Sequence, residues 1–318
     1  HEAGHTAEIV TTPQNRFGRQ LSAYWATWLT DVQVAGDGGP IDCVVSLRFP
    51  SYAVRHPNQV VWLNHRMREY YDLWDDFRSG LNRKARLVEG ARRRALHFLD
   101  GRLLHRRAVI AQSKTIQQRL RRWGGIDSDV LYPPAPQRDY RCDDYNGAIL
   151  VVGRLTKLKR VDLLLQAAAA AGGDWRVRIA GEGPERATLV KLTQELNLEH
   201  RVVLLGELDE ERLVHEYANC AAVYFGSRAE DYGLVTLEAF SSAKAVVTCT
   251  DSGGPAELVE DGVTGFVAEP EVDAVAGALA RITQETGLAE KLGAAAAEVA
   301  AQHSWPAAVE RLLAAGQP

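Results

Sequence analysis

Short apolar segments alternate with helix-length segments through the second half of the chain, and this alternation constrains the fold more than any other feature. Apolar runs at residues 148–152 and 222–225 have the length and composition of buried strands. Amphipathic patterns of helical length follow them, as at 161–171 and 233–243. Strands joined by helices of this length form parallel βαβ units, so the sequence predicts a doubly wound α/β domain here.

The first half shows the same alternation less clearly. Its length and the 318 residues of the whole chain suit about two domains. A polar, proline-containing segment at 135–146 separates the halves, so we predict domains at 1–145 and 146–318. The strands expected in the first half are 8–12, 42–47, 59–63, 108–112 and 129–132, and the helices are 20–30, 83–106 and 114–123.

Four basic residues follow the first predicted strand of the second half, which ends at Gly153. Cations placed after a strand and before a helix form an anion site, because the helix end adds free N–H groups and the positive end of its dipole. Arginine can grip a phosphate with two hydrogen bonds, while lysine acts as a point charge. The alternative is a solvated basic turn. The four residues are Arg154, Lys157, Lys159 and Arg160.

Two glutamates, Glu230 and Glu238, lie on either side of Gly233, which opens a predicted helix. Carboxylates accept hydrogen bonds from the paired hydroxyls of ribose and of sugars. A glycine lets the backbone come close to phosphate oxygens, and the N–H groups of Leu234 and Val235 are donors at the helix start. The pattern favours a binding pocket over the alternative of two surface carboxylates.

A third motif, Ser-Gly-Gly-Pro at 252–255, forms a tight loop after a predicted strand. In this order, the three motifs resemble those of the retaining family 4 glycosyltransferases of the GT-B fold. The second half resembles the family over nearly its whole length. The first half does so weakly and lacks the family's opening strand and Gly-rich turn, so we expect the natural protein to begin upstream of His1.

The resemblance implies an α/β GT-B fold, in which two doubly wound, Rossmann-like domains face each other across a cleft. It implies an acceptor-side domain at 1–145 and a donor-binding domain at 146–318, with the last helix, from about Ser304, crossing back to the first domain. His65, at the end of strand 59–63, looks like the family's cleft histidine, which contacts the donor sugar. The alternative for His65 is a plain polar surface residue.

The resemblance also assigns roles to the motif residues. Arg154 and Lys159, beside Gly153, would bind the donor diphosphate, and Glu230 would contact the donor sugar. Backbone groups of Gly233, Leu234 and Val235 would approach the sugar and the diphosphate. Glu238 would hold the ribose hydroxyls, and the turn 205–208, ending at Leu208, would hold the base. The implied catalytic residues are His65, Arg154, Lys159 and Glu230.

The implied reaction moves a hexosyl group from a nucleoside-diphosphate sugar to an acceptor hydroxyl with retained anomeric configuration. Stabilising the leaving diphosphate is then the main electrostatic task. We expect no metal and no cofactor, and a UDP-sugar in preference to a GDP-sugar as donor. The acceptor could be a glycan, a lipid-linked molecule or a small molecule. The alternatives are a GT-B sugar phosphorylase, an epimerase and a non-catalytic nucleotide-sugar binding protein.

Charge is divided unevenly along the chain. Residues 1–147 hold 22 Lys and Arg against 16 Asp and Glu, a net +6, and residues 148–318 hold 15 against 25, a net −10. The basic segment from Arg83 to Arg107 carries apolar residues at every fourth position, which predicts one buried face and a cationic remainder. Those apolar residues are Leu87, Ala91, Ala95, Leu99 and Leu103.

The basic segment suggests peripheral contact with an anionic membrane, with a solvated helix face as the alternative. We expect no nucleic-acid partner. The four cysteines are widely spaced, which favours reduced thiols in a cytoplasmic protein. The expected location is therefore the cytoplasm, with contact at the inner face of the plasma membrane.

Overall fold

The structure is a computed structural model that describes residues 4–12, 18–173 and 175–316. The chain divides into two compact units. The first comprises His1–Tyr132 and Trp305–Pro318, and the second comprises Pro133–Ser304. The division follows Tyr132, whereas the sequence placed it after residue 145, because the proline-containing segment belongs structurally to the second unit.

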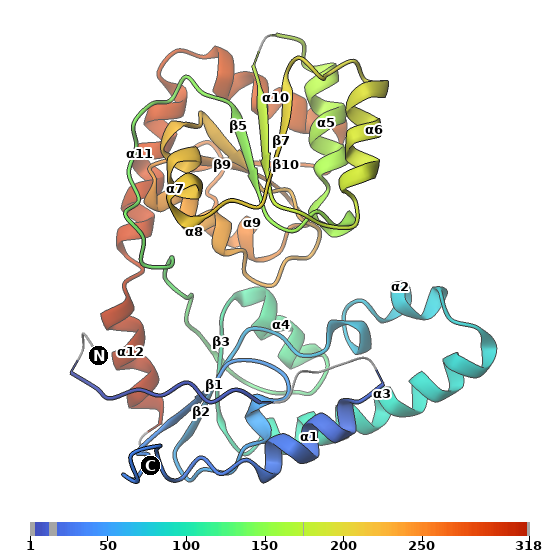
Figure 1. Cartoon of the computed structure of the whole chain (residues 1–318), viewed down its shortest axis with the longest axis vertical. Helices are drawn as coiled ribbons and strands as arrows, with labels where there is room; N and C mark the ends of the chain where they lie inside the picture. Colours follow the sequence, from blue (N-terminus) through green and yellow to red (C-terminus); the bar gives the residue numbers. More distant parts are fainter. Residues whose placement is uncertain (1–3, 13–17, 174, 317–318) are drawn as a thin grey trace. The chain divides into compact units, whose positions relative to one another are not determined.

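The first unit contains a parallel four-stranded sheet in the order β1-β2-β3-β4 (Figure 1). Residues 8–12, expected as a strand, lie outside this sheet and form no strand. The strands are β1 (Val44–Ser46), β2 (Gln59–Leu63), β3 (Ala108–Ala111) and β4 (Asp129–Val130). The helices are α1 (Gln20–Leu29), α2 (Trp74–Ser79), α3 (Arg83–Leu104), α4 (Lys114–Arg122) and α12 (Trp305–Ala315), with short 3-10 helices η1 (Ser51–Ala53) and η2 (Arg68–Tyr70).

The last helix, α12, packs on β2. The rings of Trp62 and Trp305 meet edge to face at 6.2 Å. Leu312 joins Val60 in the same apolar cluster. The C-terminal helix therefore completes the core of the first unit, although the second unit precedes it in the chain.

The second unit is a parallel six-stranded sheet in the order β10-β9-β8-β5-β6-β7. From β5 the chain adds β6 and β7 on one side of the sheet, and from β8 it adds β9 and β10 on the other side. This is the doubly wound arrangement that the sequence predicts. The strands are β5 (Ile149–Val152), β6 (Val177–Ala180), β7 (Val202–Gly206), β8 (Ala222–Tyr224), β9 (Ala245–Cys249) and β10 (Gly265–Ala268). The helices are α5 (Val161–Ala170), α6 (Arg186–Glu195), α7 (Glu210–Asn219), α8 (Leu234–Ser241), α9 (Gly254–Leu258), α10 (Val272–Gln284) and α11 (Leu288–Ala301), with the 3-10 helix η3 (Lys157–Lys159).

Helix α3 differs from its sequence expectation. The predicted buried face is wrong for Leu87, Ala91 and Ala95, which are exposed, Leu87 by 78%. Leu99 and Leu103 are only partly buried against the core. Figure 1 shows the start of α3 projecting beyond the sheet of its unit, so only its later turns reach the core. The residues of α3 that are buried are Leu96, Asp100 and Leu104.

One of these buried residues, Asp100, has its carboxyl group in the core of the first unit. It accepts hydrogen bonds from three tyrosine hydroxyls, those of Tyr24, Tyr52 (2.5 Å) and Tyr71 (2.5 Å). Burial raises the pKa of Asp100 well above its ordinary value. This cluster is not predictable from the sequence, because its members come from four different segments.

Candidate functional site

The predicted donor residues gather where the strand order of the second sheet reverses. Strands β5 and β8 are neighbours there, and the chain leaves them in opposite directions. Ligands of doubly wound sheets bind at this switch point, beyond the carboxyl ends of the strands. Gly153 follows β5, and the segment from Phe225 to Glu230 follows β8.

Gly153 has a φ of 142°, which side-chain-bearing residues rarely adopt. A Cβ atom built on it would lie 3.8 Å from Cε of Lys159, so the lysine passes beside this turn. Arg154 is exposed, and no partner for it is found among the described residues. An unpaired guanidinium next to a glycine turn can bind an anion through its free N–H donors.

Lys159 and Glu230 form the central contact of the site. Their Nζ and Oε2 atoms lie 2.6 Å apart, and both side chains are roughly one-fifth exposed. Lys159 also lies over the ring of Phe225, 4.6 Å from its centroid. The two motifs that the sequence placed 71 positions apart therefore meet at the switch point.

Gly233 caps α8 in the left-handed region, with a φ of 79°. A Cβ atom there would lie 2.5 Å from Cε1 of Phe225 and 2.8 Å from Cγ of Pro255, so both sterics and backbone require glycine. The helix begins at Leu234, so the N–H groups of Leu234 and Val235 belong to its first turn and have no intrahelical acceptor. These donors can serve an anion.

Glu238, on the second turn of α8, is only 7% exposed. Its Oε1 accepts a hydrogen bond from Nη1 of Arg138 at 2.6 Å, and its Oε2 accepts one from the hydroxyl of Tyr217 at 2.7 Å. Burial, together with the charge of Glu238, raises the pKa of the Tyr217 hydroxyl, so it stays a donor. Each carboxylate oxygen keeps further acceptor capacity for a ligand hydroxyl.

Sequence reasoning missed Arg138 and Tyr217. Arg138 lies 100 positions before Glu238, in the segment 135–146 that the sequence predicts to separate the two domains. Its Nε also contacts Glu210 at 3.0 Å, at the start of α7. No motif in the sequence indicates that Arg138 or Tyr217 contacts Glu238.

Leu208 lies in the turn between β7 and α7 and is half-buried. The next residue, Asp209, caps α7 by accepting from the N–H of Arg212 at 2.9 Å. This turn and Glu238 are linked through Arg138, which reaches from Glu238 to Glu210 just beyond the turn.

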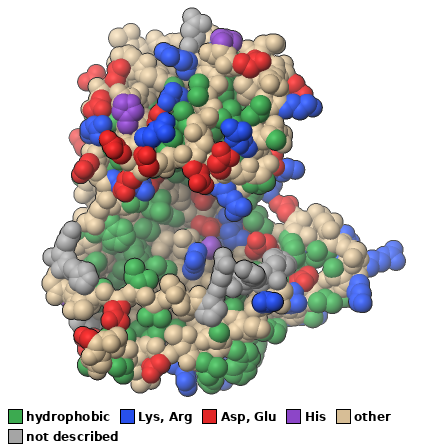
Figure 2. All heavy atoms as spheres, viewed as in Figure 1, with side chains coloured by type: hydrophobic (Ala, Val, Ile, Leu, Met, Phe, Trp, Pro, Cys, Tyr) green, Lys and Arg blue, Asp and Glu red, His purple; other side chains and the backbone are tan. Residues whose placement is uncertain are grey.

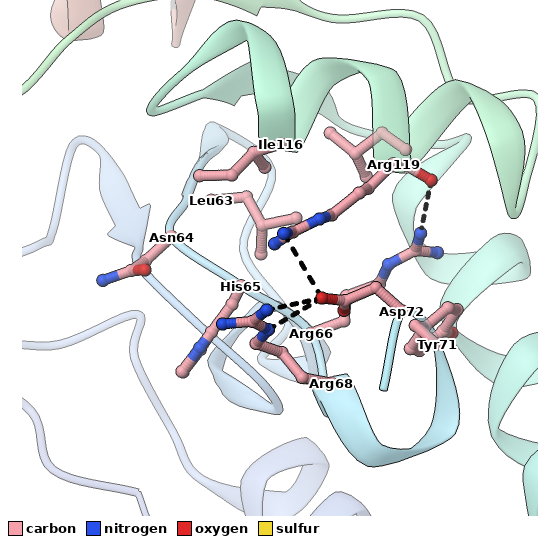
Figure 3. A pocket seen from close by; sticks show the side chains of 10 residues that line it. Leu63, Asn64, His65, Arg66, Arg68, Tyr71, Asp72, Ile116 and Arg119 are labelled. Carbon is pink, nitrogen blue, oxygen red and sulfur yellow. Dashed lines mark hydrogen bonds and ion pairs between the residues drawn. The ribbon is translucent and has the colours of Figure 1, made fainter. Parts of the chain in front are cut away.

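His65 lies in the first unit, whereas every other predicted site residue lies in the second. It follows β2 and lines a small cavity of about 20 Å³ (Figure 3). Asp72 in this cavity accepts from Arg68 at 2.6 Å and lies 3.3 Å from Arg119. His65 therefore sits beside a charged cluster rather than on an open polar surface.

Within residues 4–12, 18–173 and 175–316, no group of three or more His, Cys, Asp and Glu is arranged to hold a metal ion. None of the helices in that part of the chain combines the length and apolar character needed to cross a membrane.

Comparison with known families identifies the second unit. The sequence profile of the family "Glycosyl transferases group 1" matches residues 138–299, which is about half of the chain. The chain belongs to the glycosyl transferases group 1 family. The matched range covers Arg138, the Lys159–Glu230 pair and Glu238, so the site lies inside the family's own domain.

Several curated relatives of this group 1 chain carry glycosyltransferase names, and one is named as an exopolysaccharide phosphotransferase. It is 35% identical over 200 residues to D-inositol 3-phosphate glycosyltransferase of Mycolicibacterium smegmatis, covering 60% of this chain and 45% of the relative. It is 33% identical to alpha-D-kanosaminyltransferase of Streptomyces kanamyceticus, covering 58% and 49%. The chain thus spans about half the length of the curated relatives that it matches.

Solved structures confirm the GT-B fold for this family member. Sucrose-phosphate synthase from Thermosynechococcus elongatus matches with a TM-score of 0.70 at 20% identity, covering 87% of this chain and 74% of the synthase. Anabaena Alr3699/HepE in complex with UDP and glucose matches with a TM-score of 0.64 at 19% identity, covering 86% and 98%. At these identities the likeness concerns the fold.

Proposed function

We propose that this protein is a retaining glycosyltransferase that moves a hexosyl group from a nucleoside-diphosphate sugar to an acceptor hydroxyl. The observation that carries the proposal is the 2.6 Å contact between Lys159 and Glu230. In a nucleotide sugar the diphosphate is bonded directly to the sugar. A cation that binds the diphosphate and a carboxylate that binds the sugar must therefore lie next to each other. Glu238, one helix turn inside α8, is the proposed acceptor for the ribose hydroxyls.

The proposed mechanism depends on stabilising the leaving diphosphate. Arg154 and Lys159 supply positive charge, and the N–H groups of Leu234 and Val235 supply donors beside Gly233. The turn ending at Leu208 would hold the base, and His65 would contact the donor sugar. No cofactor or metal is part of this proposal, since cationic side chains take the role of countering the phosphate charge.

We propose UDP as the nucleotide in preference to GDP. Anabaena Alr3699/HepE is described in complex with UDP and glucose, which supports this choice by likeness of fold. The proposed acceptors are a glycan, a lipid-linked molecule or a small molecule; the names of the relatives include an inositol 3-phosphate glycosyltransferase. The proposed location is the cytoplasm, with peripheral membrane contact through the basic segment 83–107.

The test is turnover with UDP-, GDP- and ADP-sugars and a panel of hydroxyl acceptors, followed by NMR of the product's anomeric centre. We expect nucleoside diphosphate to be released only when an acceptor is present, and the product to keep the donor's configuration. Consumption of free phosphate would instead indicate a phosphorylase, and sugar isomerisation without an acceptor an epimerase. Donor binding with no turnover would support a binding protein.

A further inference from the structure

A groove lined by arginines lies between α2 and α3 in the first unit. It has a volume of about 300 Å³. Trp74 and Arg78, one helix turn apart, contribute from α2, and one face of α3 contributes the opposite wall. The residues from α3 are Arg86, Leu87, Gly90, Ala91, Arg93 and Arg94.

The charges in this groove are not balanced, because its lining residues include four arginines and no Asp or Glu. Over the whole segment 74–94, seven Arg and Lys stand against three Asp and Glu, a net +4. Arg93 donates to the carbonyl of Tyr70 at 2.8 Å and lies 4.9 Å from the ring centroid of Trp74, which orients its guanidinium without neutralising it. Arg78 and Arg94 are exposed and have no partner among the described residues. Such a set of guanidinium groups suits a phosphate, which arginine binds through paired hydrogen bonds.

Apolar side chains stand exposed beside the same groove. Leu87 is 78% exposed, Phe98 67% and Val88 49%. Figure 2 shows basic side chains gathered at the projecting end of the first unit, with hydrophobic ones next to them. Binding a soluble phosphate ester would leave this apolar surface in water. Binding a membrane would bury it at the boundary between headgroups and acyl chains.

We infer that this groove binds the phosphate of an anionic lipid headgroup, with Leu87 and Phe98 resting at the membrane boundary. The binding holds the first unit on an anionic bilayer. The inference builds on the membrane contact proposed above for segment 83–107 and names the groove that makes it. It requires neither nucleotide nor sugar transfer, so its failure can be told apart from failure of the proposed enzymatic activity.

Sedimentation of the whole chain with phosphatidylcholine vesicles, with and without phosphatidylglycerol, tests the inference. We expect binding only to the anionic vesicles. Each basic residue near such a surface contributes roughly fivefold, so Arg78→Ala combined with Arg94→Ala should weaken binding about 30-fold. The matched control is Lys191→Ala with Arg281→Ala, which removes the same charge at exposed positions of the second unit.

A glycine pair separates binding in the groove from general charge attraction. A Cβ atom on Gly90 meets nothing within 4 Å, and the same holds for Gly101 on the same helix outside the groove. Both substitutions to glutamine are therefore compatible with the fold, and both improve helix propensity. Gly90→Gln should fill the groove and weaken vesicle binding about fivefold, the effect of losing one basic residue, whereas Gly101→Gln should leave it unchanged.

Several outcomes would overturn the inference. They are failure to bind anionic vesicles, an equal loss in the control pair, and full binding by the Gly90→Gln variant. The last experiment titrates inorganic diphosphate into the protein without vesicles and measures binding. If it binds the protein without vesicles and depends on the same arginines, the groove takes soluble phosphates and the membrane assignment is wrong.

Discussion

Replacing Lys159 with alanine is expected to lower kcat for sugar transfer by about 10²–10³-fold, the usual cost of losing one group that stabilises charge developing in a transition state. Lys159 is held against Glu230 at 2.6 Å and against the ring of Phe225, so its charge is positioned before the donor arrives. Its loss removes the cation proposed to stabilise the leaving diphosphate and also removes the ion-pair partner of Glu230. Steady-state kinetics with the donor identified by turnover give the measurement.

Lys191→Ala is the control for this prediction. Lys191 lies on α6, is exposed, and forms an ion pair with Glu195 one helix turn away at 3.2 Å. Its removal should change kcat by less than about threefold, as expected for an exposed charge with weak, screened interactions. Equal losses in the two variants would show that only the general positive field matters, and an unchanged Lys159→Ala variant would remove Lys159 from the mechanism.

The second large effect concerns the stability of the first unit. Asp100→Ala is expected to lower the free energy of unfolding by about 3–5 kcal/mol, because the hydroxyls of Tyr24, Tyr52 and Tyr71 lose a buried acceptor together. Urea denaturation measures the change. The comparison variant is Asp127→Ala, whose ion pair with Arg121 is solvent-exposed and should contribute less than about 1 kcal/mol. Similar small losses in both variants would refute the structural role of Asp100.

Asp100 also gives the stability a pH dependence. Its pKa is raised in the folded state by burial, so above the ordinary carboxyl pKa the folded protein binds a proton that the unfolded chain releases. The stabilisation from this group is therefore complete below the unfolded pKa and is lost as pH rises toward the folded pKa. Asp100→Asn should remove this component, so a stability profile that keeps the same slope in the variant would contradict the assignment.

The second unit was largely predictable because its signals are local. Strand runs, helix periodicity and the glycines at 153 and 233 each report on a few neighbouring residues, and the structure places those glycines at positive φ. The contact between Glu238 and Arg138 could not be predicted in the same way. It joins residues 100 positions apart, and nothing in the polar segment around Arg138 distinguishes a site residue from a linker.

The basic helix α3 shows a different limit. Apolar residues at every fourth position describe a face, but they do not say whether the fold supplies something to cover it. The face through Leu87 projects past the sheet and stays exposed, while the buried positions lie along Leu96 and Leu104. Only the tertiary structure of the first unit shows which face of α3 is buried in the core and which face stays exposed.

The second unit is proposed to bind a nucleoside diphosphate through Lys159, the start of α8 and Glu238. The most direct test is calorimetric titration of UDP, GDP and ADP, without metal, into the protein and into its Glu238→Gln variant. We predict that one nucleotide, UDP in preference, binds with a Kd in roughly the micromolar range and that the variant loses about tenfold or more, since hydrogen bonds to a charged group contribute about 1.5–3 kcal/mol. No binding of any nucleotide, or equal affinity in the variant, would contradict the account.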